Sequence, residues 1–153
     1  MARVSTYLNF SNQTEQAFEF YRSVFGGDFL GPIHRFADMP PQPGQPPVPD
    51  AQRNLVLHIE LPILGGHILM GTDAPEGMCP GVQPGNNVYL NLEPDTRDDA
   101  RRLFEGLSAG GVIEMPLQDM FWGAYFGSCT DRFGVHWMVN CAQQPEGAKA
   151  GPV

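Results

Sequence analysis

Residues 7–27, YLNFSNQTEQAFEFYRSVFGG, decide the fold because residues 88–111, VYLNLEPDTRDDARRLFEGLSAGG, repeat their pattern. Each copy opens with a short strand-like run of alternating side chains, at 7–10 and at 88–92. A helix-like run and then a glycine pair follow the strand in both copies. The repeat indicates two modules that share one architecture.

The same helix signals occur in the two copies. Asn12 with Glu15 three positions later resembles a capping box, and Thr96 with Asp99 is a weaker form of it. Apolar residues then recur at helical spacing, which predicts one helix in each copy. They are Ala17, Phe18, Tyr21 and Phe25 in the first copy, and Ala100, Leu103, Phe104 and Leu107 in the second. Both helices should end at the glycine pair, where a left-handed backbone costs little.

Three further strand-like runs should complete each module. They lie at about 28–37, 55–61 and 67–72 in the first copy, and at about 112–118, 122–129 and 135–141 in the second. Consecutive strands joined by short turns favour antiparallel pairing over a parallel Rossmann sheet. The sequence therefore predicts an α+β fold of two tandem β-α-β-β-β modules.

Two proline- and glycine-rich segments interrupt the pattern. Residues 39–50 hold six prolines in twelve positions, and proline fixes φ and lacks the amide hydrogen, so this segment should be an extended loop. It is a lid, a spacer or a contact for another protein. Within a single domain we expect module one at about 3–73, a linker at 74–85, module two at about 86–142 and a loose tail at 143–153.

Charge and cysteine content disfavour several classes of partner. The 153 residues include 17 acidic and 9 basic side chains, for a net charge of −8, which disfavours nucleic acid and anionic membrane surfaces. No apolar run approaches the roughly 20 residues of a membrane span, and the first residues do not resemble a signal peptide. Three widely spaced cysteines argue against a disulfide framework, so we expect the reducing cytoplasm.

Residues 130–140, TDRFGVHWMVN, are the most specific part of the sequence, and residues 17–21 (AFEFY), 25–27 (FGG) and 121–123 (FWG) support them. Together with the repeat, these residues resemble the vicinal oxygen chelate superfamily, and within it the PhnB-like branch. That superfamily includes glyoxalase I, fosfomycin-resistance enzymes, extradiol dioxygenases and bleomycin-binding proteins. The resemblance implies modules whose mixed, mainly antiparallel strands curve into a cup, with the site on the concave face. It also implies a homodimer.

The resemblance also places the residues that would hold a metal. Members with metal chemistry take a His, Glu or Gln from the first and last strand of each module. In this chain the first-strand places fall at Thr6 and Asn87. The last-strand places fall at Met138 and at Met70 or Gly71. None of these is a strong ligand for such a metal, so we expect neither the chelate metal nor another cofactor.

A displaced site is the alternative. His58 lies two positions before Glu60, so both side chains should point to one face of a strand, and a turn should place Glu60 roughly opposite His67. This cluster would hold a relocated metal or transfer protons, with Asp73 as a further base. A surface ion pair predicts the same spacing, and an Asp before Ala-Pro is commonly a turn residue.

Polar and aromatic side chains of the second module suit a ligand. Alternation should place His136, Met138 and Asn140 on the inner face, where His136 either contacts a ligand or is satisfied by a carbonyl. Tyr89 and Trp122 suit a planar apolar molecule, although an ordinary core predicts such residues too. The residues we expect to bind a ligand are Thr6, His58, Asn87, Tyr89, Trp122, His136 and Met138.

Three functions follow from these observations. The first is binding of a small apolar or aromatic molecule without a metal, and whether a reaction is catalysed stays open. The second is a metal-dependent lyase, isomerase or dioxygenase with relocated ligands. The third is a structural or regulatory protein that uses the proline-rich loop. No cation accompanies Cys79 to activate it, and Cys129 and Cys141 are expected as buried strand residues.

Overall fold

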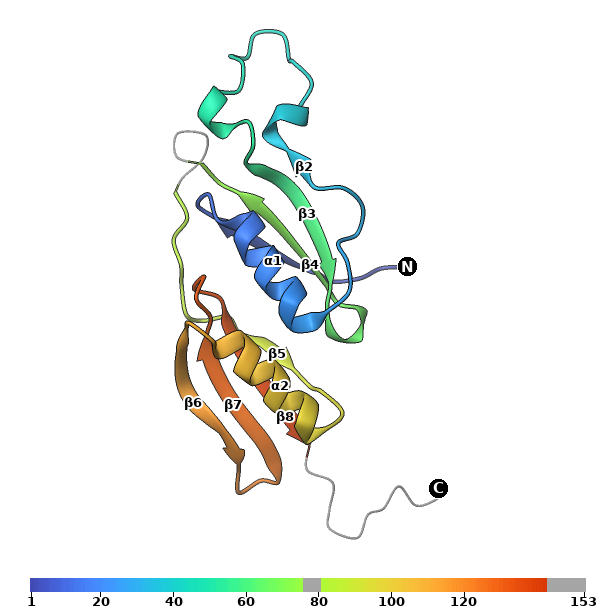
Figure 1. Cartoon of the computed structure of the whole chain (residues 1–153), viewed down its shortest axis with the longest axis vertical. Helices are drawn as coiled ribbons and strands as arrows, with labels where there is room; N and C mark the ends of the chain where they lie inside the picture. Colours follow the sequence, from blue (N-terminus) through green and yellow to red (C-terminus); the bar gives the residue numbers. More distant parts are fainter. Residues whose placement is uncertain (76–80, 143–153) are drawn as a thin grey trace. The chain divides into compact units, whose positions relative to one another are not determined.

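The computed structural model describes residues 1–75 and 81–142. The chain divides into two compact units, Met1–Pro84 and Gly85–Val153 (Figure 1). Each unit contains one four-stranded sheet with a helix on one face, so the predicted β-α-β-β-β module is confirmed twice. No helix in the described ranges is both long and apolar enough to cross a membrane.

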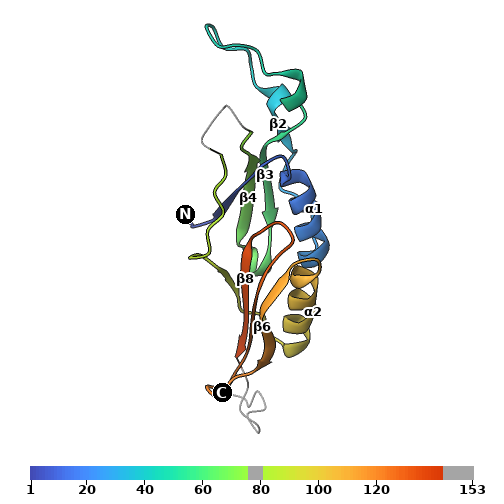
Figure 2. The ribbon, with the colours of Figure 1, turned by 90° about the vertical axis from the view of Figure 1, so that its left-hand side faces the viewer.

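The first unit has strand order β1-β4-β3-β2, with helix α1 against one face of the sheet (Figure 2). Its elements are β1 (Thr6–Phe10), α1 (Thr14–Phe25), β2 (His34–Arg35), β3 (Val56–Pro62) and β4 (Ile68–Asp73). Strands β1 and β4 pair in parallel, and the other pairs are antiparallel. The first and last strands of the unit are therefore neighbours.

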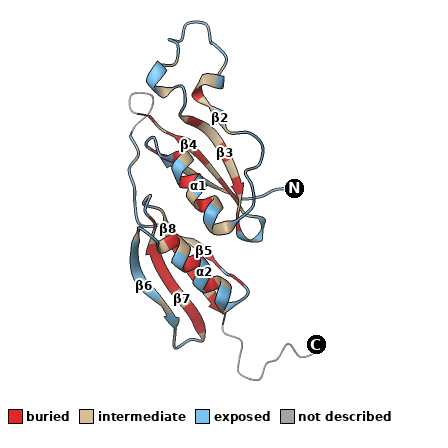
Figure 3. Ribbon diagram, viewed as in Figure 1, coloured by how far each residue is buried: buried red, intermediate tan, exposed pale blue. Residues whose placement is uncertain are grey.

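The second unit repeats this topology with strand order β5-β8-β7-β6. Its elements are β5 (Leu90–Leu92), α2 (Arg97–Ser108), β6 (Val112–Asp119), β7 (Ala124–Thr130) and β8 (His136–Ala142). Strands β5 and β8 are parallel, whereas β8–β7 and β7–β6 are antiparallel. Strand β6 at the edge is exposed along almost its whole length (Figure 3).

The prediction of a capping box formed by Asn12 and Glu15 is wrong, because helix α1 does not begin with one. Asn12 has a positive φ of 62°, and Gln13 precedes the helix without a side-chain cap. The cap is a carboxylate from another strand: Asp73 Oδ1 accepts hydrogen bonds from the backbone N–H of Thr14 at 3.1 Å and from its hydroxyl at 2.7 Å. The first turn of α1 is thereby fixed to the end of β4.

Helix α2 follows the sequence prediction more closely. The Thr96 hydroxyl oxygen accepts a hydrogen bond from the backbone N–H of Asp99 at 3.1 Å, as an N-cap should. The acidic residues of its first turn also suit the positive end of the helix dipole.

Three predicted strands are shorter than expected, and one of them, at 88–92, forms only at Leu90–Leu92. The run at 28–37 pairs only at residues 34–35, because the chain turns at Gly31 with a φ of 69° and then enters a single 3₁₀ turn at 36–38. Strand β7 begins at residue 124 because Met120 and Gly123 close a turn through a 3.0 Å backbone hydrogen bond.

The core of each unit lies between the helix and its sheet. In the first unit Ala17, Phe18 and Tyr21 of α1 are fully buried against the strands. A Cβ atom on Gly71 of β4 would collide with the Phe18 ring, so glycine allows the helix to approach the sheet closely. In the second unit Trp137 is fully buried.

Candidate functional site

The face of the first sheet that points away from α1, called here the open face of unit 1, is partly polar. Pairing sets its composition: Tyr7 lies beside Met70 in the parallel pair, and Glu60 lies across from Met70 in the antiparallel pair. The residues that alternate with these, such as Leu69 and Gly71, are buried toward the helix. The open face therefore brings together side chains of three strands.

A chain of hydrogen bonds joins three of the side chains on this face. Tyr7 Oη lies 3.0 Å from His58 Nδ1, and the two rings are 5.7 Å apart. His58 Nε2 lies 2.9 Å from Glu60 Oε1. The prediction that His58 and Glu60 share one face is confirmed. Burial, and then the negative charge of Glu60, raise the pKa of Tyr7 above its ordinary value, so this phenol is protonated at neutral pH.

His67 does not join this cluster, and the predicted pairing of Glu60 with His67 is wrong. Glu60 is opposite Met70, because the turn after β3 pairs His67 with Ile63 instead. His67 Nε2 lies 2.9 Å from the hydroxyl of Thr6.

Thr6 also lies off the open face. It is in register with the buried Leu69, so alternation turns its side chain away from the face that Tyr7 occupies. The first-strand place on the open face of unit 1 is therefore held by Tyr7, which sequence reasoning missed by one residue.

Asp73 is a structural carboxylate rather than a free base. It is buried, with an exposed fraction of 4%. Besides capping α1, its Oδ2 accepts a hydrogen bond from the backbone N–H of Val56 at 2.8 Å. Both oxygens are thus engaged in joining α1, β3 and β4, which corrects the interpretation of Asp73 as a general base and as a simple turn residue.

The corresponding face of the second sheet, the open face of unit 2, carries a similar set of residue types in a different arrangement. The Tyr89 hydroxyl donates to Glu114 Oε2 at 2.7 Å, and this hydrogen bond is the main cause that raises the pKa of Tyr89. The Tyr89 ring lies 5.0 Å from the ring of His136. The Thr130 hydroxyl lies 2.7 Å from His136 Nδ1 and 3.4 Å from Glu114 Oε1.

His136 is satisfied by a carbonyl, as one of the two interpretations predicted. Its Nε2 lies 2.6 Å from the carbonyl oxygen of Gly85, and because a carbonyl only accepts, this nitrogen carries the hydrogen. His136, Met138 and Asn140 alternate with the buried Trp137 and with other core residues, so their predicted common face is confirmed.

Two other residues expected to bind a ligand lie outside the strands. Asn87 is exposed in a bend before β5. Trp122 is 55% exposed in the turn between β6 and β7, where its ring packs edge-on against Phe121 and Phe126. It lines a cavity of about 550 Å³ together with Asn140 at the end of β8.

The family model for the glyoxalase/bleomycin resistance protein/dioxygenase superfamily matches residues 3–139. The chain belongs to this superfamily. It is 31% identical over 149 residues to protein YjdN of Escherichia coli, covering 92% of this chain and 96% of that protein. Among solved structures, protein PA1353 of Pseudomonas aeruginosa is 33% identical with a TM-score of 0.78, and the match covers 94% of this chain and all of that one.

A second structural relative supports the PhnB-like resemblance. The PhnB protein of Bacillus cereus is 26% identical, with a TM-score of 0.70 over 92% of this chain and all of that one. FosX, the fosfomycin resistance protein of Listeria monocytogenes, is 9% identical with a TM-score of 0.60 over 97% of each chain, a likeness of fold alone.

The donor set of this superfamily member does not fit the chelate metal. The ligand places that the resemblance assigns to the last strands hold Met138 and either Met70 or Gly71, so they offer at most a soft thioether. Within residues 1–75 and 81–142, no group of three or more His, Cys, Asp and Glu side chains comes close enough together to hold a metal ion. The relocated centre proposed around His58, Glu60 and His67 is therefore not assembled in the described ranges.

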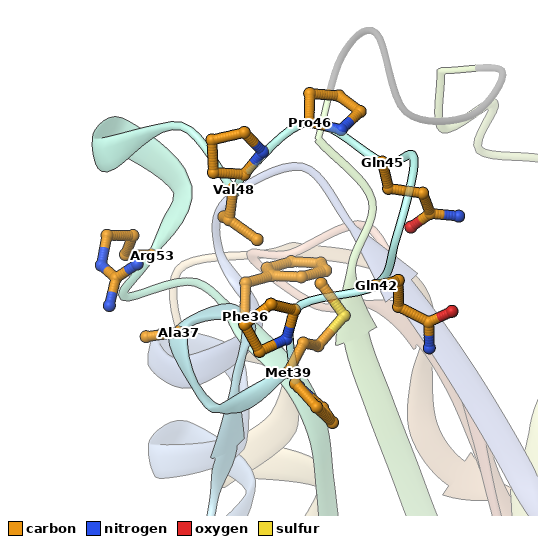
Figure 4. Close-up of a pocket in the computed structure, with 11 residues that line it drawn as sticks. Phe36, Ala37, Met39, Gln42, Gln45, Pro46, Val48 and Arg53 are labelled. Atoms are coloured by element: carbon orange, nitrogen blue, oxygen red, sulfur yellow. The ribbon is translucent and has the colours of Figure 1, made fainter.

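The proline-rich segment folds over its own pocket in the first unit (Figure 4). This pocket has a volume of about 580 Å³. Its apolar lining includes the buried Phe36 and the half-buried Met39 and Val48, and its polar groups include Gln42, Gln45 and Arg53. Gln42 and Gln45 are also joined by a 3.2 Å backbone hydrogen bond. The segment is thus an ordered loop with an apolar inner side. The residues that line its pocket are not those of the open face of unit 1.

Cys129 and Cys141 are buried free thiols, as predicted. Burial, aided by the charges of Asp131 and Glu114, raises the pKa of Cys129 to about 12. Such a thiol is not a nucleophile near neutral pH. Cys79, the third cysteine, lies outside the described residues.

Proposed function

We propose that this member of the superfamily binds a small apolar or aromatic molecule on its open faces without a chelated metal. The observation that carries the proposal is the composition of the open face of unit 1. The tyrosine ring and the methionine side chain offer apolar and polarisable surface, while the hydrogen-bonded polar ends of His58 and Glu60 offer a few fixed polar points.

The open face of unit 2 supports the same proposal. Met138 lies between Asn91 and Ser128 in the sheet, with Tyr89 and His136 nearby on the same face. Ring stacking and thioether–ring contacts favour a planar ligand. Tyr7, His58, Tyr89, His136 and Met138 are the proposed binding residues, and Trp122 and Asn140 would bind at the neighbouring cavity.

The test is a thermal-unfolding titration of metal-stripped protein. Naphthol, as an aromatic probe, should raise Tm in a saturable way, because a ligand that binds only the native state stabilises it by about 2.7 kcal/mol at a hundredfold excess over Kd. Tyr7→Ala should raise the Kd for naphthol at least tenfold. Replacing a buried core tyrosine by alanine would unfold the unit and is therefore not informative.

The same titration with Mn²⁺, Fe²⁺, Ni²⁺ and Zn²⁺ tests the metal-free part of the proposal. We expect no saturable rise in Tm with any of them. A stoichiometric metal that raises Tm, and whose effect disappears in His58→Ala, would contradict the proposal and support a relocated metalloenzyme site.

We further propose that the protein is a cytoplasmic homodimer. The family resemblance supports dimerisation, and the reduced Cys129 and Cys141 are consistent with a reducing compartment.

A further inference from the structure

Both ring nitrogens of His58 are engaged, and their partners fix the direction of the hydrogen bonds. Glu60, as a carboxylate, only accepts, so His58 Nε2 carries the hydrogen that is donated across 2.9 Å. In the neutral ring Nδ1 is then the acceptor. The hydroxyl of Tyr7, 3.0 Å away, therefore donates to it. The three side chains form a directed chain in which the phenol proton already points at a base.

We propose that Tyr7 and His58 form a proton relay that removes a proton from a small organic molecule bound on the open face of unit 1, with Glu60 as a positioning residue. This inference rests on the proposed function, since its substrate is a molecule bound at that face. The substrate class is a weak acid: a C–H next to a carbonyl or in an electron-poor ring, or a hydroxyl.

The step balances without any further reactant. The substrate–hydrogen bond breaks and its proton forms a new bond to Tyr7 Oη, while the phenol O–H bond breaks and that proton moves to His58 Nδ1. The electron pair stays on the substrate as a carbanion, an alkoxide or the electrons of a departing group. The carboxylate of Glu60 faces the imidazolium that forms and offsets its charge.

The exposure of the three side chains determines which of them a bound molecule contacts first. Tyr7 is 47% exposed, whereas the side chains of His58 and Glu60 are 32% and 25% exposed. A molecule on the open face therefore meets the phenol before the imidazole, which makes Tyr7 the catalytic residue that touches the substrate. The raised pKa of Tyr7 makes a free phenolate costly, and the relay avoids one because the phenol gains a proton as it loses one.

The second unit is an internal contrast. There Tyr89 donates directly to Glu114, and His136 uses its two nitrogens for Thr130 and for the Gly85 carbonyl. The same residue types are present, but the Tyr89 hydroxyl donates to a carboxylate and not to the nearby His136. The relay is therefore a feature of the first unit.

The experiment uses the full chain with nitrobenzisoxazole, an aromatic probe whose ring opens to a coloured phenolate when a base removes its carbon-bound proton. Wild-type protein should accelerate ring opening with saturation. Tyr7→Phe and His58→Gln should each lower kcat about a hundredfold with KM changed less than threefold. The double variant should be no slower than either single variant, because the two residues act as a unit.

The matched control is His67→Gln, which removes an imidazole that lies off the open face beside Thr6 and should leave kcat unchanged. Circular dichroism checks that every variant is folded. Glu60→Ala, which removes both acceptor oxygens, tests the positioning residue through a spectroscopic signature: the downfield proton resonance of His58 Nε2, present in wild-type protein, should disappear as kcat falls. A kcat that falls while this resonance persists would show that Glu60 does not act by positioning His58.

The outcomes separate the relay from the proposed function. If the probe raises Tm but wild-type protein opens it no faster than His58→Gln, the relay is wrong and binding stands. If Tyr7→Phe keeps the wild-type kcat while His58→Gln loses it, the relay through tyrosine is wrong. If the probe neither raises Tm nor reacts, both proposals are wrong.

Discussion

At the scale of single residues, the carboxylate of Asp73 holds together three elements of the first unit, α1, β3 and β4. Asp73 accepts hydrogen bonds from two backbone N–H groups, those of Thr14 and Val56, and from the Thr14 hydroxyl. Local sequence suggested Asn12 as the cap, because capping patterns are defined over four neighbouring residues. The true acceptor is 59 positions away and reaches the helix only through the sheet.

Asp73→Ala should destabilise the protein by about 3 kcal/mol, because it leaves two backbone donors buried without acceptors. Asp73→Asn, which keeps one acceptor oxygen, should cost less. Chemical denaturation measures both, with the exposed Asp28→Asn as the control. Equal stability of Asp73→Ala and wild-type protein would show that these hydrogen bonds contribute nothing.

The Cys129 thiol gives a prediction for pH. Its pKa is about 12 in the folded protein and about 8.5 in an unfolded chain. Between these values the folded state holds a proton that the unfolded state has released, so the free energy of unfolding should fall as pH rises through this window. Cys129→Ala should flatten this alkaline loss, as urea titrations at a series of pH values would show. If the free energy of unfolding falls with pH equally steeply in Cys129→Ala and in wild-type protein, the Cys129 thiol is not the cause of the alkaline loss.

At the scale of elements, periodicity predicted most of the fold. Both helices and the long strands β3, β4, β6, β7 and β8 lie where their apolar patterns placed them. What periodicity did not predict is which strand residues meet. Tyr7 rather than Thr6 occupies the open face, and Glu60 meets Met70 rather than His67, because both depend on strand register. A one-residue error in register moves a side chain to the opposite face.

The contact between α1 and its sheet depends on Gly71. Gly71→Ala should cost about 1–3 kcal/mol, since the new methyl group would overlap the Phe18 ring and the helix must shift. Gly81→Ala, where the added methyl meets no atom, is the matched control and should change stability by less than about 0.5 kcal/mol. Phe18→Leu should partly relieve the cost of Gly71→Ala. If the two costs simply add, the overlap is not their cause.

At the scale of the whole molecule, the chain is one topology used twice. Each unit pairs its first strand with its last in parallel, so each sheet is complete within its own unit. The repeat keeps the same residue types on the two open faces but changes their hydrogen bonds. The sequence therefore indicated Tyr89 and His136 as site residues, but it did not reveal that Tyr7 is hydrogen-bonded to a histidine whereas Tyr89 is hydrogen-bonded to a glutamate. Which side chains come within hydrogen-bonding distance of each other cannot be predicted from the order of residue types along the chain.

The assembly state belongs to this scale. Sedimentation equilibrium should give twice the chain mass of 16.8 kDa at micromolar concentration. A single species at the chain mass would contradict the proposed homodimer, although it would leave ligand binding on each unit untouched.

The bond network of Asp73 also has a consequence for the order of events during synthesis. The segment that becomes α1 leaves the ribosome long before residue 73 does, and its first turn has no local cap to hold it. An isolated helix of this length is marginal in water. Helix α1 should therefore persist only once the last strand of its own unit has emerged, so that the first 75 residues fold in one late step rather than from their beginning onward.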